Sequence, residues 1–230
     1  MSLIGAGYEI VKSLATLRSD FQILLGCTQA HLGEHAAASM GAPTNVNPIQ
    51  LDTTDDQSIE QAAKAIEQHF GRIDVLINNA SFTGQISSAD DETSSLPQTT
   101  RALWQKVYDV NVIGTALVTD RLISLLQQSK APRVIFMSSD LGTFASATQE
   151  GTAPQSNLAF SSSKTAVNML VVQYAKKYPE ITINACSPDN SGSTADKADA
   201  SATAASAVQL ATTAGGESGT FVDSAGTIEW

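Results

Sequence analysis

Short apolar runs recur along the chain, and stretches in which apolar residues return every three or four positions separate most of them. The runs cover residues 21–25, 46–51, 73–77, 134–137 and 181–185. The run at 73–77 shows no alternation of apolar and polar residues, which is typical of a strand that is covered on both faces. Strands that alternate with helices favour an α/β fold, in which helices cover both sides of a parallel sheet.

The stretches between these runs have the spacing of helices and the composition of loops. Ser58 could cap a helix whose inner face begins at Ile59. Further helices are expected at 101–128, 164–177 and 205–212, loops at 80–100, 140–157 and 189–204, and a last strand at 219–222. We find neither an internal repeat nor a second domain, and 230 residues suit one α/β unit. We therefore expect a single domain over residues 1–230.

Composition and charge exclude several classes of partner. The net charge is −10 and no cluster of Lys or Arg stands out, so we expect no nucleic-acid partner. No apolar run approaches the length of about 18 residues that a membrane span needs, so we expect no membrane partner. We see no secretory signal, and the two cysteines, Cys27 and Cys186, fit buried reduced thiols. These features favour a cytoplasmic protein.

Polar residues stand where several of the expected strands and helices end. The run Asp74–Ala80 reads Asp-Val-Leu-Ile-Asn-Asn-Ala, and Asp52 lies 26 residues before Asn78. Asn111 follows in a helix and Ser139 closes the next strand. Each of these could have an ordinary structural role: the asparagines at a strand end, Asp52 in a helix cap, Asn111 at a kink and Ser139 in a turn. Their order along the chain is the informative feature.

Two further segments complete the pattern. Residues 160–164 read Phe-Ser-Ser-Ser-Lys, and Pro188 follows the strand at 181–185. Lys164 alone could be a solvated helix lysine. Together the set resembles the short-chain dehydrogenase/reductase family, and its carbonyl-reductase-like members in particular, over roughly residues 4–230. The family's Tyr-x-x-x-Lys signature matches with Phe160 in place of Tyr. The resemblance implies a Rossmann-like doubly wound parallel sheet.

The resemblance also implies catalytic roles. In the family, a hydride passes between a nicotinamide and a carbonyl carbon, and a phenol gives the proton. Asn111, Ser139 and Lys164 match the positions that support this step, and Phe160 occupies the position of the phenol. Phe has no proton to give, and a positioned general acid contributes about 10² to 10⁴ in rate. We therefore expect impaired turnover.

The amino end departs from the family pattern. Gly5 and Gly7 match the last two glycines of the phosphate-binding turn, whereas the first glycine is absent and the first strand is truncated or missing. The resemblance places Asp52 near the adenine. Other residues that it implies for the cofactor are Asn79, Ala80, Lys164 and Pro188, and Asp189 stands where the family usually has Gly. We expect weak binding.

The kind of cofactor is expected from the resemblance alone. The segment Gly26–His31 holds no acidic residue, which would favour NAD, and no basic residue apart from His31. Carbonyl-reductase relatives usually carry Arg near Thr28. We expect NADP, with NAD as the alternative, and no metal.

The leading functional hypothesis is an NADP(H)-dependent oxidoreductase that interconverts a small carbonyl and an alcohol, with impaired activity. The alternative is a non-catalytic family member, a pseudoenzyme that acts as a binding or oligomerisation partner. The helices at 101–128 and 158–177 carry apolar residues on more than one face. In the family these two helices form a dimer seam, so we expect a homodimer or homotetramer.

Overall fold

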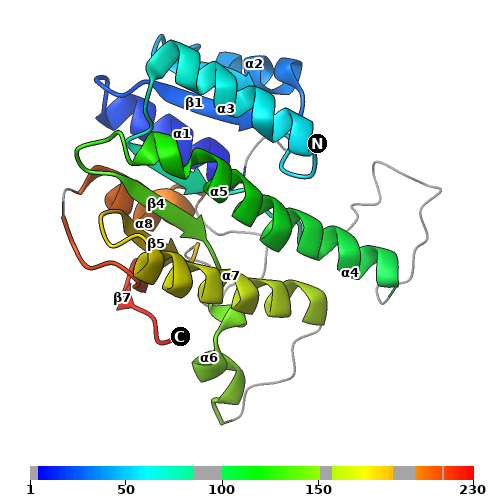
Figure 1. The fold of residues 1–230 in the computed structure, drawn as a ribbon. Coiled ribbons are helices and arrows are strands. Elements are labelled where there is room, and N and C mark those ends of the chain that lie inside the picture. The colour runs from blue at the N-terminus through cyan, green and yellow to red at the C-terminus, as the bar shows by residue number, and fades with distance from the viewer. Residues whose placement is uncertain (1–4, 85–99, 151–156, 189–199, 214) are drawn as a thin grey trace.

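The computed structural model describes residues 5–84, 100–150, 157–188, 200–213 and 215–230 (Figure 1). Its strands are β1 (Ile23–Cys27), β2 (Val46–Gln50), β3 (Val75–Asn78), β4 (Arg133–Met137), β5 (Thr182–Cys186), β6 (Phe221–Asp223) and β7 (Gly226–Thr227). Its α-helices are α1 (Ala6–Leu17), α2 (Ala30–Ser39), α3 (Asp56–Phe70), α4 (Arg101–Tyr108), α5 (Thr115–Leu126), α6 (Phe144–Thr148), α7 (Leu158–Lys177) and α8 (Ala200–Thr212). A π-helical turn, η1 (Asp109–Gly114), and a 3₁₀ turn, η2 (Asp140–Gly142), complete the elements.

The strands form two sheets. β1 pairs with β2, and β3, β4, β5, β6 and β7 form a second sheet in that order. Every pairing is parallel except that of β7 with β6. The parallel α/β architecture predicted from the sequence is confirmed, and β7 is an antiparallel addition that the sequence analysis did not predict. The expectation of a truncated or missing first strand falls on residues 1–4, which lie outside the described ranges.

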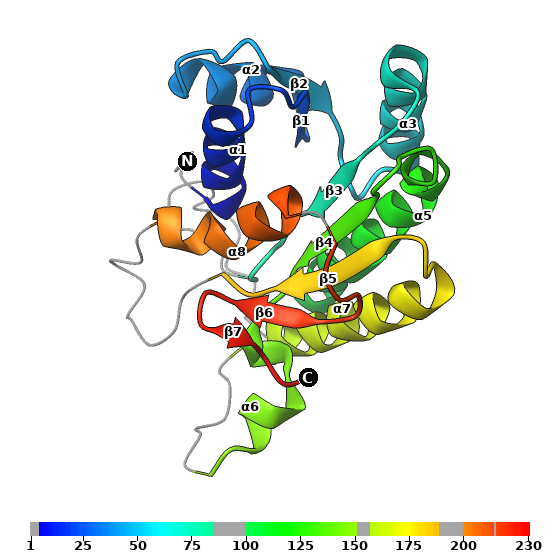
Figure 2. The ribbon, with the colours of Figure 1, turned by 90° about the vertical axis from the view of Figure 1, so that its left-hand side faces the viewer.

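Helices cover both faces of the strands (Figure 2). On one face, Ile135 and Met137 of β4 pack with α1 and α8. On the other face, Val134 and Phe136 pack with α5 and α7. α2 joins α1 in a small cluster beside β1 and β2, and α3 joins α5 over β1, β2 and β3. β3, whose sequence shows no alternation, packs with α1 and α8 on one face and with α3 and α5 on the other, as predicted.

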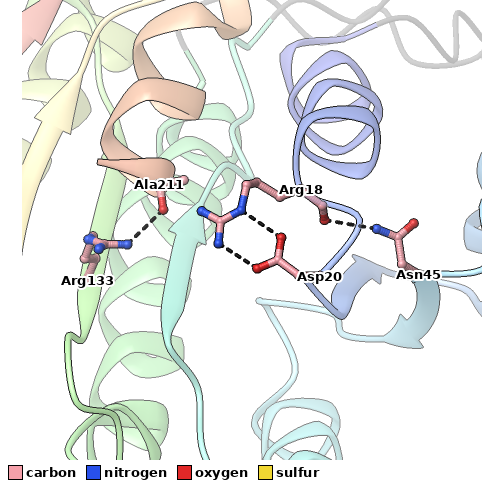
Figure 3. A network of polar contacts seen from close by, with 5 residues as sticks. All are labelled: Arg18, Asp20, Asn45, Arg133 and Ala211. Carbon is pink, nitrogen blue, oxygen red and sulfur yellow. Dashed lines mark hydrogen bonds and ion pairs between the residues drawn. The ribbon is translucent and has the colours of Figure 1, made fainter. Parts of the chain in front are cut away.

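Polar contacts fix the ends of two of these helices (Figure 3). The Asn45 side chain, just before β2, donates to the carbonyl oxygen of Arg18 at the end of α1, at 3.3 Å. The Arg18 guanidinium in turn binds Asp20 at 2.7 Å. Arg133 at the start of β4 donates to the carbonyl oxygen of Ala211 near the end of α8, at 2.9 Å. Both helices are thus held at the amino ends of the strands.

Several predicted boundaries are wrong. The helix at 101–128 is interrupted by η1, and the loop expected at 140–157 contains η2 and α6. α8 begins at residue 200, within the segment that we assigned to a loop. α2 was not predicted, because its buried face consists only of the small residues Gly33 and Ala37 and gives no apolar periodicity.

The predicted cap of α3 is also wrong. Asp55 caps this helix by accepting the N–H of Gln57 at 2.9 Å. The hydroxyl of Ser58 lies one turn further on and accepts the N–H of Asp52 at 2.9 Å. Ser58 therefore fixes the loop after β2 rather than the helix start.

Gly114, the last residue of η1, allows a close approach of two segments. A Cβ atom at Gly114 would lie 2.4 Å from the carbonyl oxygen of Thr53, in the loop that follows β2. This separation is shorter than any van der Waals contact, and the obstacle is backbone. The loop around Asp52 can therefore rest on η1 only if residue 114 has no side chain.

We expect Gly114→Ala to destabilise the protein. The helical backbone of Gly114 (φ −59°, ψ −42°) would by helix propensity alone favour Ala by about 1 kcal/mol. The clash with Thr53 should reverse the sign and lower the free energy of unfolding by about 1–3 kcal/mol. Urea denaturation measures the difference. A stabilised variant would show that the Thr53 loop does not need this contact.

Candidate active site

The candidate residues gather at the carboxyl ends of the strands. Asp52 follows β2, Asn79 and Ala80 follow β3, Ser139 follows β4 and Pro188 follows β5. Carboxyl ends of parallel strands meet at one edge of the sheet, where open α/β folds bind ligands. Sequence residues far apart are thereby brought to one side of the molecule.

Lys164 is buried in α7, with 3% of its surface exposed. Its ammonium Nζ donates a hydrogen bond to the carbonyl oxygen of Met137, the last residue of β4, at 2.8 Å. Burial lowers the pKa of Lys164 to about 8, because the charged form loses its hydration. The reading of Lys164 as a solvated lysine is therefore wrong.

Phe160 lies one helical turn before Lys164, and the two side chains point to the same side. The Nζ atom of Lys164 is 5.5 Å from the centroid of the Phe160 ring. This is within the range of a cation–π contact. The predicted juxtaposition of ring and ammonium is present.

Asn111 is buried in η1, with 1% of its surface exposed, and its amide joins three segments. Its Oδ1 accepts the N–H of Phe82 at 2.7 Å, and its Nδ2 donates to the Phe82 carbonyl at 3.1 Å. The same Nδ2 donates to the hydroxyl of Ser163 at 2.9 Å. Ser163 donates to the carbonyl oxygen of Phe160 at 2.7 Å. Asn111 thus connects the chain after β3 to the start of α7.

Ser139 begins the η2 turn after β4. Its hydroxyl accepts the N–H of Leu141 at 3.3 Å and donates to the Asp140 carboxylate at 3.2 Å. Ser139 is half-buried, and these two bonds give it the role in a turn that the sequence left open. The turn uses the one proton and one lone pair of this hydroxyl, so the hydroxyl could donate to a ligand only by releasing Asp140.

The η2 turn is clamped to α7 beside Lys164. A Cβ atom at Gly142 would lie 2.6 Å from Cβ of Lys164 and 2.7 Å from its backbone carbon. Asn168 donates to the Gly142 carbonyl at 3.2 Å and accepts a short hydrogen bond from the Ser138 hydroxyl. The turn that carries Ser139 is therefore fixed against the helix that carries Lys164.

Sequence reasoning missed these positioning residues, Ser138, Gly142, Ser163 and Asn168. A signal was available for Asn168, which stands four residues after Lys164 and so shares its helix face. A polar residue on an inward helix face needs a partner, and here the turn after β4 supplies it. Gly142 gave no signal, because loop glycines are common.

The glycines of the amino end lie next to the end of β3. Gly5 is the residue that caps α1, without a side-chain hydrogen bond, and no atom lies within 4 Å of where its Cβ would be. A Cβ at Gly7 would lie 2.5 Å from Nδ2 of Asn79. The start of α1 and the Asn79 side chain therefore lie next to each other. Such a helix start suits an anion such as a phosphate.

Asn78 and Asn79 point to different partners. Asn78 donates through Nδ2 to the Thr119 hydroxyl of α5, at 2.9 Å, and thereby ties β3 to that helix. Asn79 lies against Gly7. The sequence left open a purely structural role for the two asparagines at the end of this strand. The hydrogen bond to Thr119 gives Asn78 such a role.

Asp52 folds back on its own loop. Its Oδ1 accepts both the N–H of Thr54, at 2.9 Å, and the hydroxyl of Thr54, at 2.7 Å. Asp52 does not cap α3, since Asp55 does, so the helix-cap alternative is wrong. Ala80 is exposed and Pro188 is half-buried, whereas Asp189 lies outside the described residues.

Other kinds of site are not found in the part of the chain that the structure describes. No group of His, Cys, Asp and Glu there could hold a metal ion. None of the helices described is both long and apolar enough to cross a bilayer. Cys27 and Cys186 are not joined in a disulfide, and Cys186 is buried as predicted while Cys27 is half-buried.

We expect the stability of the protein to depend on the charge of Lys164. Its folded pKa of about 8 lies below the ordinary 10.5, so the unfolded chain binds the proton more tightly. Below about pH 8 the fold bears the full cost, about 3 kcal/mol, and stability is regained as pH rises toward the unfolded pKa. Lys164→Met should therefore be more stable than the parent near neutral pH, by an amount that shrinks above about pH 8.

Urea denaturation at several pH values between about 7 and 10 measures this difference. Lys176→Met, an exposed position on the same helix, is the matched control and should change stability little at every pH. A constant difference between Lys164→Met and the parent would show that the ammonium is not the group that loses its proton.

Comparison with known proteins agrees with this architecture. The family model for short chain dehydrogenases matches residues 3–204. The short-chain dehydrogenase/reductase ATR10 of Stachybotrys chlorohalonatus is 33% identical over 193 residues, which are 80% of this chain and 66% of that protein. The related tropE of Talaromyces stipitatus is 28% identical over 188 residues, or 74% of this chain and 67% of that protein. The chain thus spans about two thirds of the length of these relatives.

Solved structures share the fold. Salutaridine reductase from Papaver somniferum superposes with a TM-score of 0.80 at 24% identity, covering 96% of this chain and 97% of that one. Menthone neomenthol reductase from Mentha piperita gives a TM-score of 0.74 at 24% identity, covering 96% and 95%. With a family model that matches most of its length, the chain belongs to the short-chain dehydrogenase/reductase family.

Proposed function

We propose that this protein is a carbonyl-reductase-like oxidoreductase, NADP(H)-dependent, with impaired turnover. The observation that carries the proposal is the buried Lys164 ammonium, which is 5.5 Å from the ring centre of Phe160 and bound to the end of β4. A phenol at position 160 would need a cation of this kind nearby, and the ring present there has no hydroxyl. The relatives named above are reductases, and two act by name on the small molecules salutaridine and menthone. A small carbonyl or alcohol substrate is consistent with this.

The residues divide the work as follows. Ser139 would hold the carbonyl oxygen of the substrate by turning its hydroxyl proton from Asp140 to the substrate. Lys164 would supply positive charge, which favours negative charge on an adjacent oxygen. Asn111 would act through others, since its hydrogen bonds fix Phe82 and Ser163. No side chain at position 160 can give a proton, and this is the reason we propose impairment.

The described residues fit a dinucleotide in part. The uncapped start of α1 at Gly5, with open space beside it, suits a phosphate, and Gly7, Asn79, Ala80, Asp52, Lys164 and Pro188 would complete the site. When bound, the nicotinamide supplies the hydride. Oδ1 of Asp52 already accepts two bonds from Thr54, which leaves less of this carboxylate for a ligand. We therefore propose weak binding of NADP, with NAD as the alternative.

A second candidate function is a non-catalytic family member that binds a partner or oligomerises. Phe160 favours this second function, because its ring can pack in the site but has no proton to give. The two functions differ in one measurable property: whether a hydroxyl restored at residue 160 restores turnover. One substitution therefore tests both.

We expect Phe160→Tyr to raise carbonyl reduction at least about tenfold, a modest share of what a general acid contributes. Lys164 is already placed to lower the pKa of the new phenol, and Ser139 to hold the carbonyl. NADPH oxidation against a panel of small aldehydes and ketones measures the rate, and fluorescence titration of NADPH measures binding. Phe144→Tyr, the same change at a ring that is 71% exposed on α6, is the control and should leave the rate unchanged.

The double variant Phe160→Tyr with Lys164→Met should lose the gain. A parent protein as fast as ordinary relatives would contradict the proposed impairment. If the Phe160→Tyr protein binds NADPH and remains inactive, the proposed enzymatic function is wrong and the non-catalytic function is favoured. Binding of NADPH with a low-micromolar dissociation constant would contradict the proposed weak binding of the cofactor.

We also propose a homodimer or homotetramer. Exposed apolar side chains lie on α4, η1 and α5, at Trp104, Ile113 and Leu117, and on α7, at Leu158 and Met169. Tyr174 of α7 is buried and donates to Asp120 at 2.8 Å, so it does not belong to this surface.

Light scattering should show an oligomer at micromolar concentration, and the charged variant Ile113→Lys should dissociate it. The same change at Leu17, 66% exposed on α1, should leave the oligomer intact. A clean monomer of the parent would contradict this prediction.

A further inference from the structure

Lys164 carries an amine that few groups of the fold bind. Its Nζ atom donates to the carbonyl oxygen of Met137 at 2.8 Å. An ammonium has three protons, and this bond uses one of them. In the described part of the chain, no carboxylate forms an ion pair with Lys164. Among these residues, the ammonium is therefore buried without a negatively charged partner.

Apolar groups lie beside this side chain. The centre of the Phe160 ring is 5.5 Å from Nζ, and Gly142 of η2 packs against the backbone and Cβ of Lys164. Asp140, the carboxylate of η2, is exposed. Burial lowers the pKa of Lys164 to about 8, and Cys186 of β5 opposes this shift with a smaller effect. The surroundings thus favour the neutral amine over the ammonium.

A neutral amine is a nucleophile, whereas an ammonium is not. Because the pKa is about 8, about a quarter of the Lys164 side chains are neutral at about pH 7.5. An ordinary lysine is neutral in about one molecule in a thousand at this pH. If amines follow the Brønsted slope of thiols, the lower basicity slows attack roughly tenfold and leaves a net gain of about twentyfold. Lysines that apolar burial activates in this way form Schiff bases with carbonyl compounds.

The amine lies at the edge of the sheet where the candidate site residues meet. Phe160, one turn before Lys164, and Ser139, in the turn after β4, are both half-buried, so solvent reaches part of each residue. A flat apolar molecule that packs on the Phe160 ring would therefore lie beside Nζ. The ring has no oxygen that could accept a proton from the ammonium, so it leaves the amine available.

We propose that Lys164 forms a reversible Schiff base with a small neutral aldehyde or ketone at this edge of the sheet, beside Phe160. The nitrogen lone pair attacks the carbonyl carbon, a C–N bond forms, and the π electrons of the C=O bond move to the oxygen. The C–O bond of this carbinolamine then breaks, and the two protons of the amine leave with the oxygen as water. The product has a C=N bond, and nothing is oxidised or reduced.

This reaction differs from the oxidoreductase function proposed above. It needs neither a nicotinamide nor a phenol, and so it does not rest on that function. An aromatic aldehyde suits the site, because two rings attract each other in offset or edge-to-face arrangements. A charged carbonyl compound would lose hydration beside Phe160. The ligand class is therefore a neutral carbonyl compound with an apolar body.

Reductive trapping on the full chain, without NADPH, measures the Schiff base. Benzaldehyde is the probe, and sodium cyanoborohydride reduces the imine to a stable benzylamine. Peptide mass mapping over time, at about pH 7.5, gives the rate at each lysine. We expect Lys164 to gain the benzyl group at least about tenfold faster than Lys176, which is exposed on the same helix. In urea-unfolded protein the two rates should agree within about twofold, since the fold supplies the difference.

Two variants assign the fast reaction to one residue. Lys164→Met should remove it, and Lys176→Met should retain it. Equal rates at Lys164 and Lys176 in the folded protein overturn the proposal. A preference for Lys164 that survives unfolding also overturns it, because the local sequence would then be its cause. NADPH oxidation is a separate measurement, so an absence of carbonyl reduction would contradict the oxidoreductase function and leave the trapping result unaffected.

Discussion

The site depends on one buried amide, the side chain of Asn111. It accepts from and donates to the backbone of Phe82 and also donates to Ser163 of α7, so three segments distant in sequence share it. Asn111 lies in the π-helical turn η1, and Gly114 at the end of that turn lets the loop that carries Asp52 rest on the turn. A fully bonded amide in a buried position is costly to disturb, because each lost partner leaves an unsatisfied polar group. The two ends of the site, around Asp52 and around Lys164, are connected through this turn.

In the part of the chain that the structure describes, the strands form two sheets, and helices pack across both of them. Among the described residues, β1 and β3 exchange no ladder hydrogen bonds, and α1 with α8 on one face, and α3 with α5 on the other, pack against both strands. Arg121 of α5 binds Glu60 of α3, and Asn45 and Arg133 fix the ends of α1 and α8. Side-chain packing thus contributes to the position of Asp52 relative to Lys164.

Local patterns in the sequence were sufficient for the strands and for the order of the site residues. Short stretches rich in apolar residues located β1 to β5, and the spacing of Phe160 and Lys164 on one helix was enough to place the ammonium beside the ring. What the sequence could not supply depends on contacts between distant segments. The π-helical turn η1 interrupts the predicted helix at 101–128 and ends at Gly114, beside Thr53. No residue pattern around position 114 predicts this interruption. α2 has no apolar stripe, and the role of Asn168 depends on a turn thirty residues earlier, at Ser138. The site residues themselves are placed by the structure, and their chemical roles remain proposals.

The Lys164 ammonium gains two attractions in the fold and loses its hydration. The ammonium has three protons, and Met137 accepts one of them. The Phe160 ring adds an attraction of about 0.5–2 kcal/mol at most, since its centre is 5.5 Å away. Burial outweighs these gains, as the lowered pKa shows. Packing alone does not require a cation here, because a Met side chain fills a similar volume without the loss of hydration. Lys164 is bound to Met137 and packed against Gly142, and a cation there, which the packing of the fold does not require, is consistent with the role proposed for it above.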